Sequence, residues 1–342
     1  MRIHSLPTTR LLELAVVCLL AACQPSAAPS PSAAPSPSAA TSPSAAPSPN
    51  ATPSATGLAL TDDEGTTTVL PAAPQTLVSL TPATTELLFA LGAGDLLRGR
   101  TDYDDFPPGA AALPVVATFE GVQIEKVVDI DPDLVLAGGN NFTSQADVQR
   151  LRELGIAVLV VYAPDVEGVL ADIRLVGRAV GAEAEAESVV GAIQQRIDEV
   201  TAAVASLHRP RVFYEIGNLP EIYGPAPDSF VADMVSLAGG DPITTTDPAV
   251  FSIALERLVT LDPQVIVLGD AAYGVCPDSV AGRPGWPGIT AVRDGDVRPV
   301  DDIIVTRPGP RLGEGLAALA LAIHPDALID PPTTGTDYCP SL

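Results

Sequence analysis

The sequence predicts an α/β protein of two Rossmann-like lobes with parallel sheets, joined by a single long helix. Short apolar segments typical of buried strands alternate with helical patterns, which favours parallel sheets that helices cover on both faces. A 15-residue phrase occurs twice, as EKVVDIDPDLVLAGG at 125–139 and as ERLVTLDPQVIVLGD at 256–270. Between the copies, residues 182–207 are rich in Ala and Glu and lack proline, as expected of one continuous helix.

The first lobe is expected over residues 58–165. Thr81 is a good N-cap and Pro82 suits the first position of a helix, so a helix is predicted to begin there. Gly92 or Gly94 is expected to end it. The other elements predicted in this lobe are strands at 75–80, 134–138 and 158–163 and a helix in SQADVQRLRELG.

The second lobe is expected over residues 209–342, after a connecting helical segment at 166–208. It continues the alternation of strand and helix patterns, which again favours a parallel sheet. The elements predicted in this lobe are strands at 211–217, 265–270 and 297–300 and a helix in DSFVADMVSLAGG.

The repeated phrase fits this two-lobe arrangement. Each copy predicts a short helix that begins near its Glu, ends at Asp-Pro and leads into a core strand. Only five of the fifteen positions are identical, so chance or a shared local pattern is an alternative explanation. The DIDPD of the first copy also resembles the start of a calcium loop. However, Leu134 and Asn140 stand where that loop needs Gly and Glu, which excludes calcium.

The first 23 residues have the features of an export signal. Arg2 and Arg10 precede the apolar stretch LLELAVVCLLAA, which is too short to span a bilayer comfortably. The segment ends in LAAC, and this resembles the lipobox of bacterial lipoproteins, in which the cysteine, here Cys23, carries the lipid. We therefore expect a lipoprotein signal peptide at 1–23. Ordinary signal cleavage beside an incidental cysteine is the alternative.

A tether is expected over residues 24–57. This segment contains no charged residue and repeats a Pro-Ser-Ala-Ala unit. A chain so poor in large apolar side chains cannot offset the entropy of ordering, so it is predicted to be disordered. Because it is rich in proline, it would reach on the order of 100 Å at about 3.1 Å per residue.

Two cysteines remain outside the signal and the expected lipid site. Cys276 and Cys339 form an even pair in an exported chain, which favours a disulfide between the C-terminal tail and the loop at 271–288. Two free thiols are the alternative. The sequence has no CxxC motif, so it does not indicate a thiolate metal site.

The charge and the motifs exclude several classes of function. The chain has 18 Lys and Arg against 42 Asp and Glu, a net charge of −24, and such a surface repels nucleic acid. It holds no nucleophile elbow, phosphate loop or dinucleotide fingerprint. His4, His208 and His324 have no second His or Cys at ligand spacing. We expect no enzyme, metal site or cofactor, although the many acids leave a purely carboxylate-based enzyme open.

Aromatic and charged side chains gather in loops of both lobes, in a chain that is only 4% aromatic. Two-lobed α/β proteins bind ligands in the cleft beyond the carboxyl ends of their strands. Flat rings there would cover a planar ligand, and Asp and Arg would bind its polar groups. The residues concerned are Tyr103, Phe106, Phe119, Trp286, Asp301, Asp302, Arg307 and Arg311.

Four segments carry a resemblance to a known family: SLTPATTELLFALGAGD, TDYDDFPP, IEKVVDIDPDLVLA and RPGPRLGEGLAALALAIHP. Over roughly residues 74–328 the chain resembles the substrate-binding lipoproteins of ABC importers that bind cobalamin, ferric siderophores and haem. It is most similar to the vitamin B12-binding branch. The resemblance implies a fold of the class III periplasmic-binding-protein type, with the ligand held between the lobes.

The resemblance also implies ligand contacts. Tyr103 matches a tyrosine that packs on the corrin ring, and Phe119 matches a position where the branch often has Trp. Asp302 and Arg307 fall near an acid and a base that contact the amide edge of the ligand, although the spacing differs slightly. Trp286 is a weaker match, because its loop is hard to place.

Two further residues match the family's docking positions. Glu125 and Glu256, one in each copy of the repeated phrase, match glutamates that form ion pairs with arginines of the two permease subunits. A permease with two similar halves would need two similar docking faces, which explains the repetition. Ordinary solvated acids on helix surfaces are the alternative.

Together these inferences predict an extracytoplasmic, monomeric receptor, anchored to the cell membrane through Cys23. It would deliver cobalamin or a related corrinoid to an ABC permease dimer without catalysis. A ferric siderophore or haem receptor of the same class is the alternative. Of another class, a surface-displayed α/β hydrolase on the same tether would explain the export and the fold.

Overall fold

The structure, a computed structural model, describes residues 57–139, 142–333 and 338–339. All of them belong to one compact unit of the chain. The predicted signal peptide, Cys23 and nearly all of the predicted tether lie outside these residues. Among the residues that the structure describes, no helix combines the length and apolar character needed to cross a membrane.

The first lobe is built on a six-stranded sheet with the order β6-β5-β4-β3-β7-β8. All neighbouring strands run parallel except the short β5–β6 pair, which is antiparallel. All residues of β3, β7 and β8 are buried, as expected of strands covered on both faces. The strands are β3 (Leu77–Ser79), β4 (Leu97–Thr101), β5 (Val115–Thr118), β6 (Gly121–Val122), β7 (Leu134–Ala137) and β8 (Val158–Val160).

The helices of this lobe begin where the sequence predicts. The Thr81 side chain accepts a hydrogen bond from the backbone N–H of Thr84 and caps α1, with Pro82 at the first turn. Gly92, with a φ of 71°, follows the end of this helix, in a conformation that glycine adopts without strain. Ser144 caps the next predicted helix in the same way. The helices are α1 (Pro82–Ala90), α2 (Ile124–Ile130) and α3 (Gln145–Glu153).

An antiparallel hairpin that the sequence analysis did not predict precedes the first lobe. It consists of β1 (Leu58–Thr61) and β2 (Thr67–Leu70), and most of its residues are exposed or half-buried. Asp62 holds its turn, accepting from the backbone N–H of Thr66 and from Arg152 of α3.

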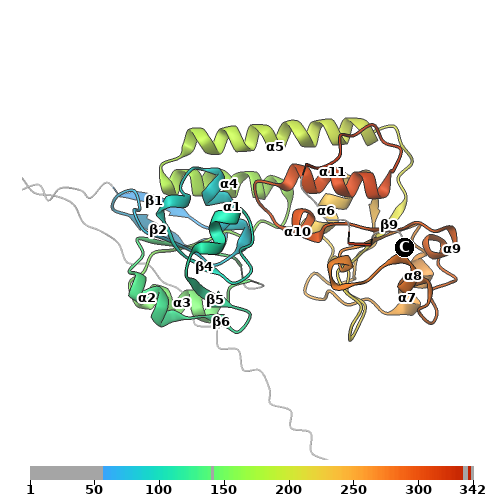
Figure 1. Cartoon of the computed structure of the whole chain (residues 1–342), viewed down its shortest axis with the longest axis horizontal. Coiled ribbons are helices and arrows are strands. Elements are labelled where there is room, and N and C mark those ends of the chain that lie inside the picture. The colour runs from blue at the N-terminus through green and yellow to red at the C-terminus, as the bar shows by residue number, and fades with distance from the viewer. Residues whose placement is uncertain (1–56, 140–141, 334–337, 340–342) are drawn as a thin grey trace, which may run out of the picture. The chain divides into compact units, whose positions relative to one another are not determined.

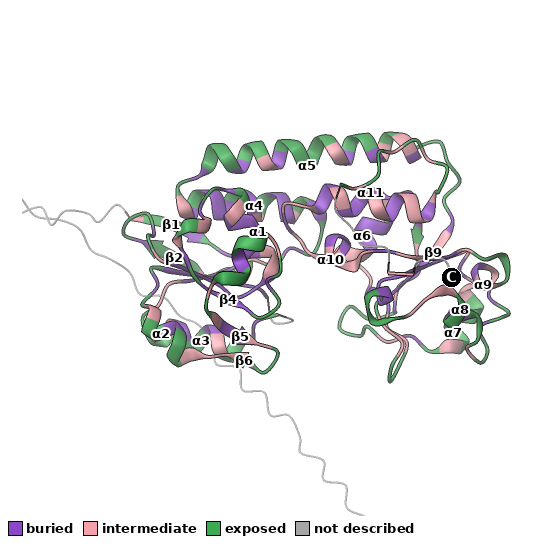
Figure 2. Cartoon of the chain, in the orientation of Figure 1, coloured by how far each residue is buried: buried purple, intermediate pink, exposed green. Residues whose placement is uncertain are grey.

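Two helices connect the lobes, α4 (Val166–Val180) and α5 (Glu183–Val204). Gly181, in the left-handed region, allows the sharp turn between them. One face of α5 is buried against α4 and against α11 (Leu312–Ile323), and its other face is exposed (Figures 1 and 2). The predicted single long helix is therefore confirmed, and it spans both lobes along one side. Its buried residues recur every three or four positions: Ala186, Val190, Ile193, Ile197, Val200 and Val204.

The second lobe has a four-stranded parallel sheet with the order β10-β9-β11-β12. A disulfide joins Cys276 to Cys339 and so ties the C-terminal tail to this lobe. The strands are β9 (Arg211–Glu215), β10 (Asp241–Pro242), β11 (Val265–Leu268) and β12 (Val297–Pro299), and the helices are α6 (Phe230–Leu237), α7 (Leu255–Leu261), α8 (Pro277–Ala281), α9 (Thr290–Asp294), α10 (Asp302–Thr306) and α11.

The repeated phrase forms the same unit in each lobe. Its first copy builds α2 and β7, and its second builds α7 and β11. Asp131 and Asp262, at the equivalent C-caps, both adopt the left-handed conformation, with φ values of 51° and 46°. The seven residues of the two helices have the same class of burial at every position. In Figure 1, α2 and α7 both lie on the side away from α5.

Candidate functional site

Exposed aromatic rings stand beyond the carboxyl ends of the first sheet. Tyr103 follows β4 and is 50% exposed, and Phe119 follows β5 and is 90% exposed. Both residues were predicted from the sequence as ligand contacts. A phenyl ring left almost fully in water has an apolar surface that a bound ligand would cover.

Further apolar side chains are exposed at these edges, and the sequence analysis missed them. In the first lobe, Phe142 after β7 is 60% exposed and its ring centroid lies 6.1 Å from that of Tyr162, which follows β8. In the second lobe, Leu219 after β9 and Tyr273 after β11 are 84% and 88% exposed. Phe142, Leu219 and Tyr273 each follow a predicted strand closely, so position after a strand was the available signal for them. Tyr162 lies within the strand predicted at 158–163, which the structure ends at Val160.

Asp302 lies at the carboxyl end of β12 and is held by its neighbours. The hydroxyl of Tyr214 donates to its Oδ1 at 2.7 Å, and the hydroxyl of Thr306 donates to its Oδ2 at 3.2 Å. Burial raises the pKa of Asp302. The carboxylate is therefore engaged within its own lobe, and a ligand group would meet an acid that is already hydrogen-bonded.

Two further acids, Glu215 and Asp270, lie at the carboxyl ends of β9 and β11. Glu215 is fully buried and accepts two hydrogen bonds from Arg283, at 2.6 and 2.8 Å. Asn218 donates to Oδ2 of Asp270 at 2.9 Å, while the buried Oδ1 of Asp270 has no hydrogen-bond partner among the residues that the structure describes. Burial and the neighbouring Glu215 raise the pKa of Asp270 to about 6. These acids hold the two loops in place. Because Arg283 is bound to Glu215, its positive charge is not available to a ligand.

Trp286 does not lie at the site that was predicted for it. It is only 3% exposed and belongs to the apolar core of the second lobe. The guanidinium of Arg283 lies 4.5 Å from the centre of its ring. Because protein atoms cover the indole, it offers no open face to a ligand, and we correct the expectation of a ligand contact here.

Arg307 takes part in a contact between the lobes. Its Nη1 donates to Glu86 of α1 at 2.9 Å and to Asp105 at 2.6 Å, and its Nη2 donates to the carbonyl of Tyr103 at 3.4 Å. Arg311 makes two further bonds to Glu86, both at 2.7 Å, and stacks on the ring of Phe106. Glu86 is 3% exposed. Arg307 thus belongs to an ion-pair cluster that joins the two lobes, and its ligand contact stays a prediction.

Glu125 and Glu256 occupy equivalent exposed positions in the first turns of α2 and α7. Neither carboxylate has a hydrogen bond or ion pair to another described residue. The basic residue that follows each is turned back to its own lobe: Lys126 donates to the carbonyl of Val115 at 3.1 Å and Arg257 to that of Thr244 at 3.5 Å. Both carboxylates are therefore free to meet a partner.

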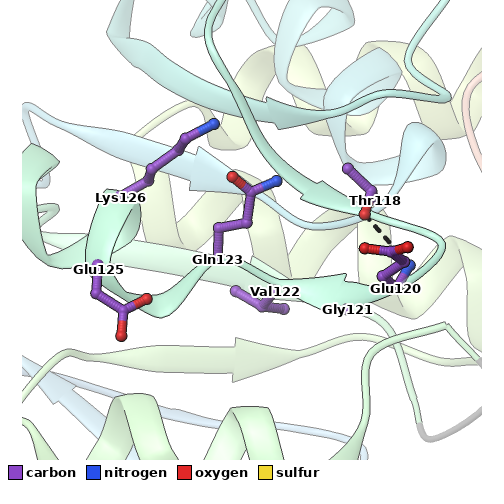
Figure 3. A pocket seen from close by; sticks show the side chains of 7 residues that line it. All are labelled: Thr118, Glu120, Gly121, Val122, Gln123, Glu125 and Lys126. Atoms are coloured by element: carbon purple, nitrogen blue, oxygen red, sulfur yellow. Dashed lines mark hydrogen bonds between the residues drawn. The ribbon is translucent and has the colours of Figure 1, made fainter.

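A hollow of about 510 Å³ lies beside Glu125. Figure 3 shows the side chains of Glu125 and Lys126 pointing in opposite directions from α2, with Glu120 at the other end of the hollow. Its lining contains two acids and one base: Thr118, Glu120, Gly121, Val122, Gln123, Glu125 and Lys126. No group of three or more metal-ligating side chains occurs among the described residues.

The chain is similar to proteins of a known family. The family model described as "Periplasmic binding protein" matches residues 77–303. The chain is 34% identical to an ABC transporter substrate-binding lipoprotein of Bacillus subtilis, over 74% of this chain and 81% of the relative. It is 30% identical to a cobalamin-binding protein of Halobacterium salinarum, over 77% and 73% of the two chains.

Solved structures share the fold. A periplasmic vitamin B12-binding protein of Vibrio cholerae superimposes with a TM-score of 0.64 at 23% identity, covering 73% of this chain and 96% of that one. A periplasmic haem-binding protein of Pseudomonas aeruginosa gives the same TM-score at 26% identity, covering 77% and 95%. The relatives are solute-binding proteins and not enzymes, which leaves the hydrolase alternative without support. The chain belongs to the periplasmic binding protein family, as a substrate-binding component of an ABC transporter.

Proposed function

We propose that the protein binds cobalamin or a related corrinoid between its lobes and delivers it to an ABC permease. One observation supports this most: apolar side chains stand exposed at the carboxyl ends of both sheets, with Tyr103 and Phe119 in one lobe and Leu219 and Tyr273 in the other. A large, flat chelate would cover these side chains from two sides. The relatives named for cobalamin and vitamin B12 support the same choice.

The charged residues near these side chains favour a ligand that carries few or no negative groups. Arg283, Arg307 and Arg311 of the second lobe are each already bound to a buried carboxylate. Arg100, three residues before Tyr103, donates to the backbone carbonyls of Thr101 and Ala111. A polyanionic siderophore or the two carboxylates of haem would need positive charge that these arginines do not offer. The neutral amides of a corrinoid would instead hydrogen-bond to exposed backbone and side-chain groups.

Haem is the second candidate ligand, because exposed phenols are present. Tyr103 and Tyr273 are 50% and 88% exposed, and a phenolate oxygen can ligate haem iron. Uptake by living cells separates the candidates. Cells that lack the chain should fail to take up labelled cyanocobalamin at limiting concentration, and the chain should restore uptake. Restoration of haem-dependent growth without cyanocobalamin uptake would reverse the assignment.

We further propose that residues 1–23 are a lipoprotein signal, that Cys23 carries the lipid and that residues 24–57 tether the two lobes to the membrane. The B. subtilis relative, which is named a lipoprotein, supports this. Replacing Cys23 by Ala should release the protein from the membrane fraction into the medium. Retention of the C23A variant in membranes, with no lipid on the wild type by mass spectrometry, would contradict the anchor.

Docking through Glu125 and Glu256 is also part of the proposal. The two carboxylates stand in equivalent places, are exposed and lack partners among the described residues. An ion pair at an exposed rim contributes about 1 kcal/mol or less, so these pairs would set orientation more than affinity.

A further inference from the structure

The two copies of the repeated phrase share more than their glutamates. Val128 of α2 and Val259 of α7 are 43% and 39% exposed, and they occupy the same position in the two copies. A single exposed valine is ordinary on a protein surface. These two valines lie at equivalent positions of two equivalent helices. Each follows by three residues an exposed Glu whose carboxylate has no partner in the described part of the chain, which calls for a common explanation.

Helix geometry places each valine beside its glutamate. Residues at i and i+3 are neighbours on one helix face, so Glu125 lies next to Val128 and Glu256 next to Val259. The intervening basic residues, Lys126 and Arg257, donate to backbone carbonyls of their own lobes. Each helix therefore presents one free carboxylate and one apolar side chain together, without a neutralising base between them.

We propose that these four residues form two equivalent contact patches, each made of a glutamate and a valine, for a membrane protein with two like halves. Each half would offer a basic side chain to the glutamate and an apolar side chain to the valine. This inference rests on the proposed docking of the protein to a permease and adds the apolar half of the contact.

The apolar contact would contribute affinity that persists at high salt concentration, which the exposed ion pairs do not. Exposed ion pairs contribute little and weaken as salt screens them, whereas buried apolar area holds an interface together over a wide range of salt concentration. The hollow beside Glu125 gives the first patch room for a long basic side chain, since Glu120 and Glu125 both line it.

Site-specific photo-crosslinking in cells tests the contact without assuming a substrate. A benzophenone amino acid replaces Val128 or Val259 in the full-length chain, and Val69 of the hairpin, 58% exposed, serves as the matched control. We expect crosslinks from positions 128 and 259 to one and the same permease polypeptide and none from position 69. Crosslinks to unrelated proteins, or equal crosslinking from position 69, would overturn the proposal.

Substitution tests the contribution of the valines to transport. Val128→Asp with Val259→Asp should lower cyanocobalamin uptake about ten-fold or more, with an unchanged Kd for cyanocobalamin and an unchanged melting temperature. Val69→Asp should leave uptake intact. Wild-type uptake by the double variant would refute the apolar contact. If the crosslinks form but wild-type cells take up no cyanocobalamin, the docking proposal stands and the proposed substrate is wrong.

Discussion

The two lobes resemble each other in one region and differ in another. The helices α2 and α7 match in burial at each of their seven positions and in their left-handed Asp caps. The carboxyl ends of the sheets do not match: the first lobe exposes Tyr103 and Phe119 there, whereas the second exposes Leu219 and Tyr273 and buries its Trp286 in the core. A partner with two like halves explains the matching region, and a single asymmetric ligand explains the region that differs.

The largest expected effect concerns the cluster that joins the lobes. Glu86→Gln would leave Arg307 and Arg311 without their shared carboxylate, and breaking a buried pair in this way costs about 3–5 kcal/mol of unfolding free energy. Urea denaturation measures the loss. The control is Glu153→Gln, whose ion pair with Arg150 is exposed and contributes about 0.5 kcal/mol or less. Equal stability of the two variants would show that the lobes do not depend on this cluster.

Charge reversal at Glu125 and Glu256 tests the helices α2 and α7, where the two lobes match. Glu125→Lys with Glu256→Lys should abolish transport and leave the Kd for cyanocobalamin unchanged, because the lysines would repel the basic side chains of the partner. Uptake and calorimetric titration measure the two quantities. Glu185→Lys with Asp198→Lys, on the exposed face of α5, makes the same change in net charge and should transport normally. Normal uptake by the first variant would remove the docking role.

Replacement of single aromatic rings tests the carboxyl ends of the sheets, where the two lobes differ. Phe119→Ala should weaken cyanocobalamin binding about ten-fold, since its exposed ring would lose its contact with the ligand. Trp286→Phe should leave the affinity unchanged and lower the unfolding free energy by about 1–3 kcal/mol, because this ring packs in the core. The opposite pattern in titration and denaturation would reverse the assignment of these two rings.

The smallest expected effect is the pH dependence of stability from Asp270. Its pKa is raised from 3.8 to about 6 in the folded state, so folding favours the protonated form. That contribution is complete below about pH 4 and is lost as the pH rises through 6. Asp270→Asn should flatten this decline, by about 1–2 kcal/mol between pH 5 and 8. Parallel curves for wild type and D270N in urea denaturation would show that Asp270 does not titrate in this range.

Local patterns predicted the architecture well. The strands, the Thr81 and Pro82 start of α1 and the long α5 follow from hydrophobic spacing and capping, which depend on residues near in sequence. The hairpin β1–β2 was missed because its strands are short and largely exposed, so they lack a buried apolar run.

The site was less predictable, because its contacts join distant segments. Arg307 and Glu86 are separated by 221 residues, so no local pattern indicates that this arginine binds an acid of the other lobe. Burial of Trp286 likewise depends on the packing of the second lobe as a whole. The exposed positions of Tyr103 and Phe119 could be anticipated because each closely follows a strand end, and their role in binding stays a prediction.

Calorimetric titration of residues 57–342 with cyanocobalamin, with hemin and a ferric siderophore in parallel, tests the central claim most directly. The claim predicts tight one-to-one binding of cyanocobalamin and much weaker binding of the other two. Tight binding of hemin or the siderophore, with no heat from cyanocobalamin, would contradict it.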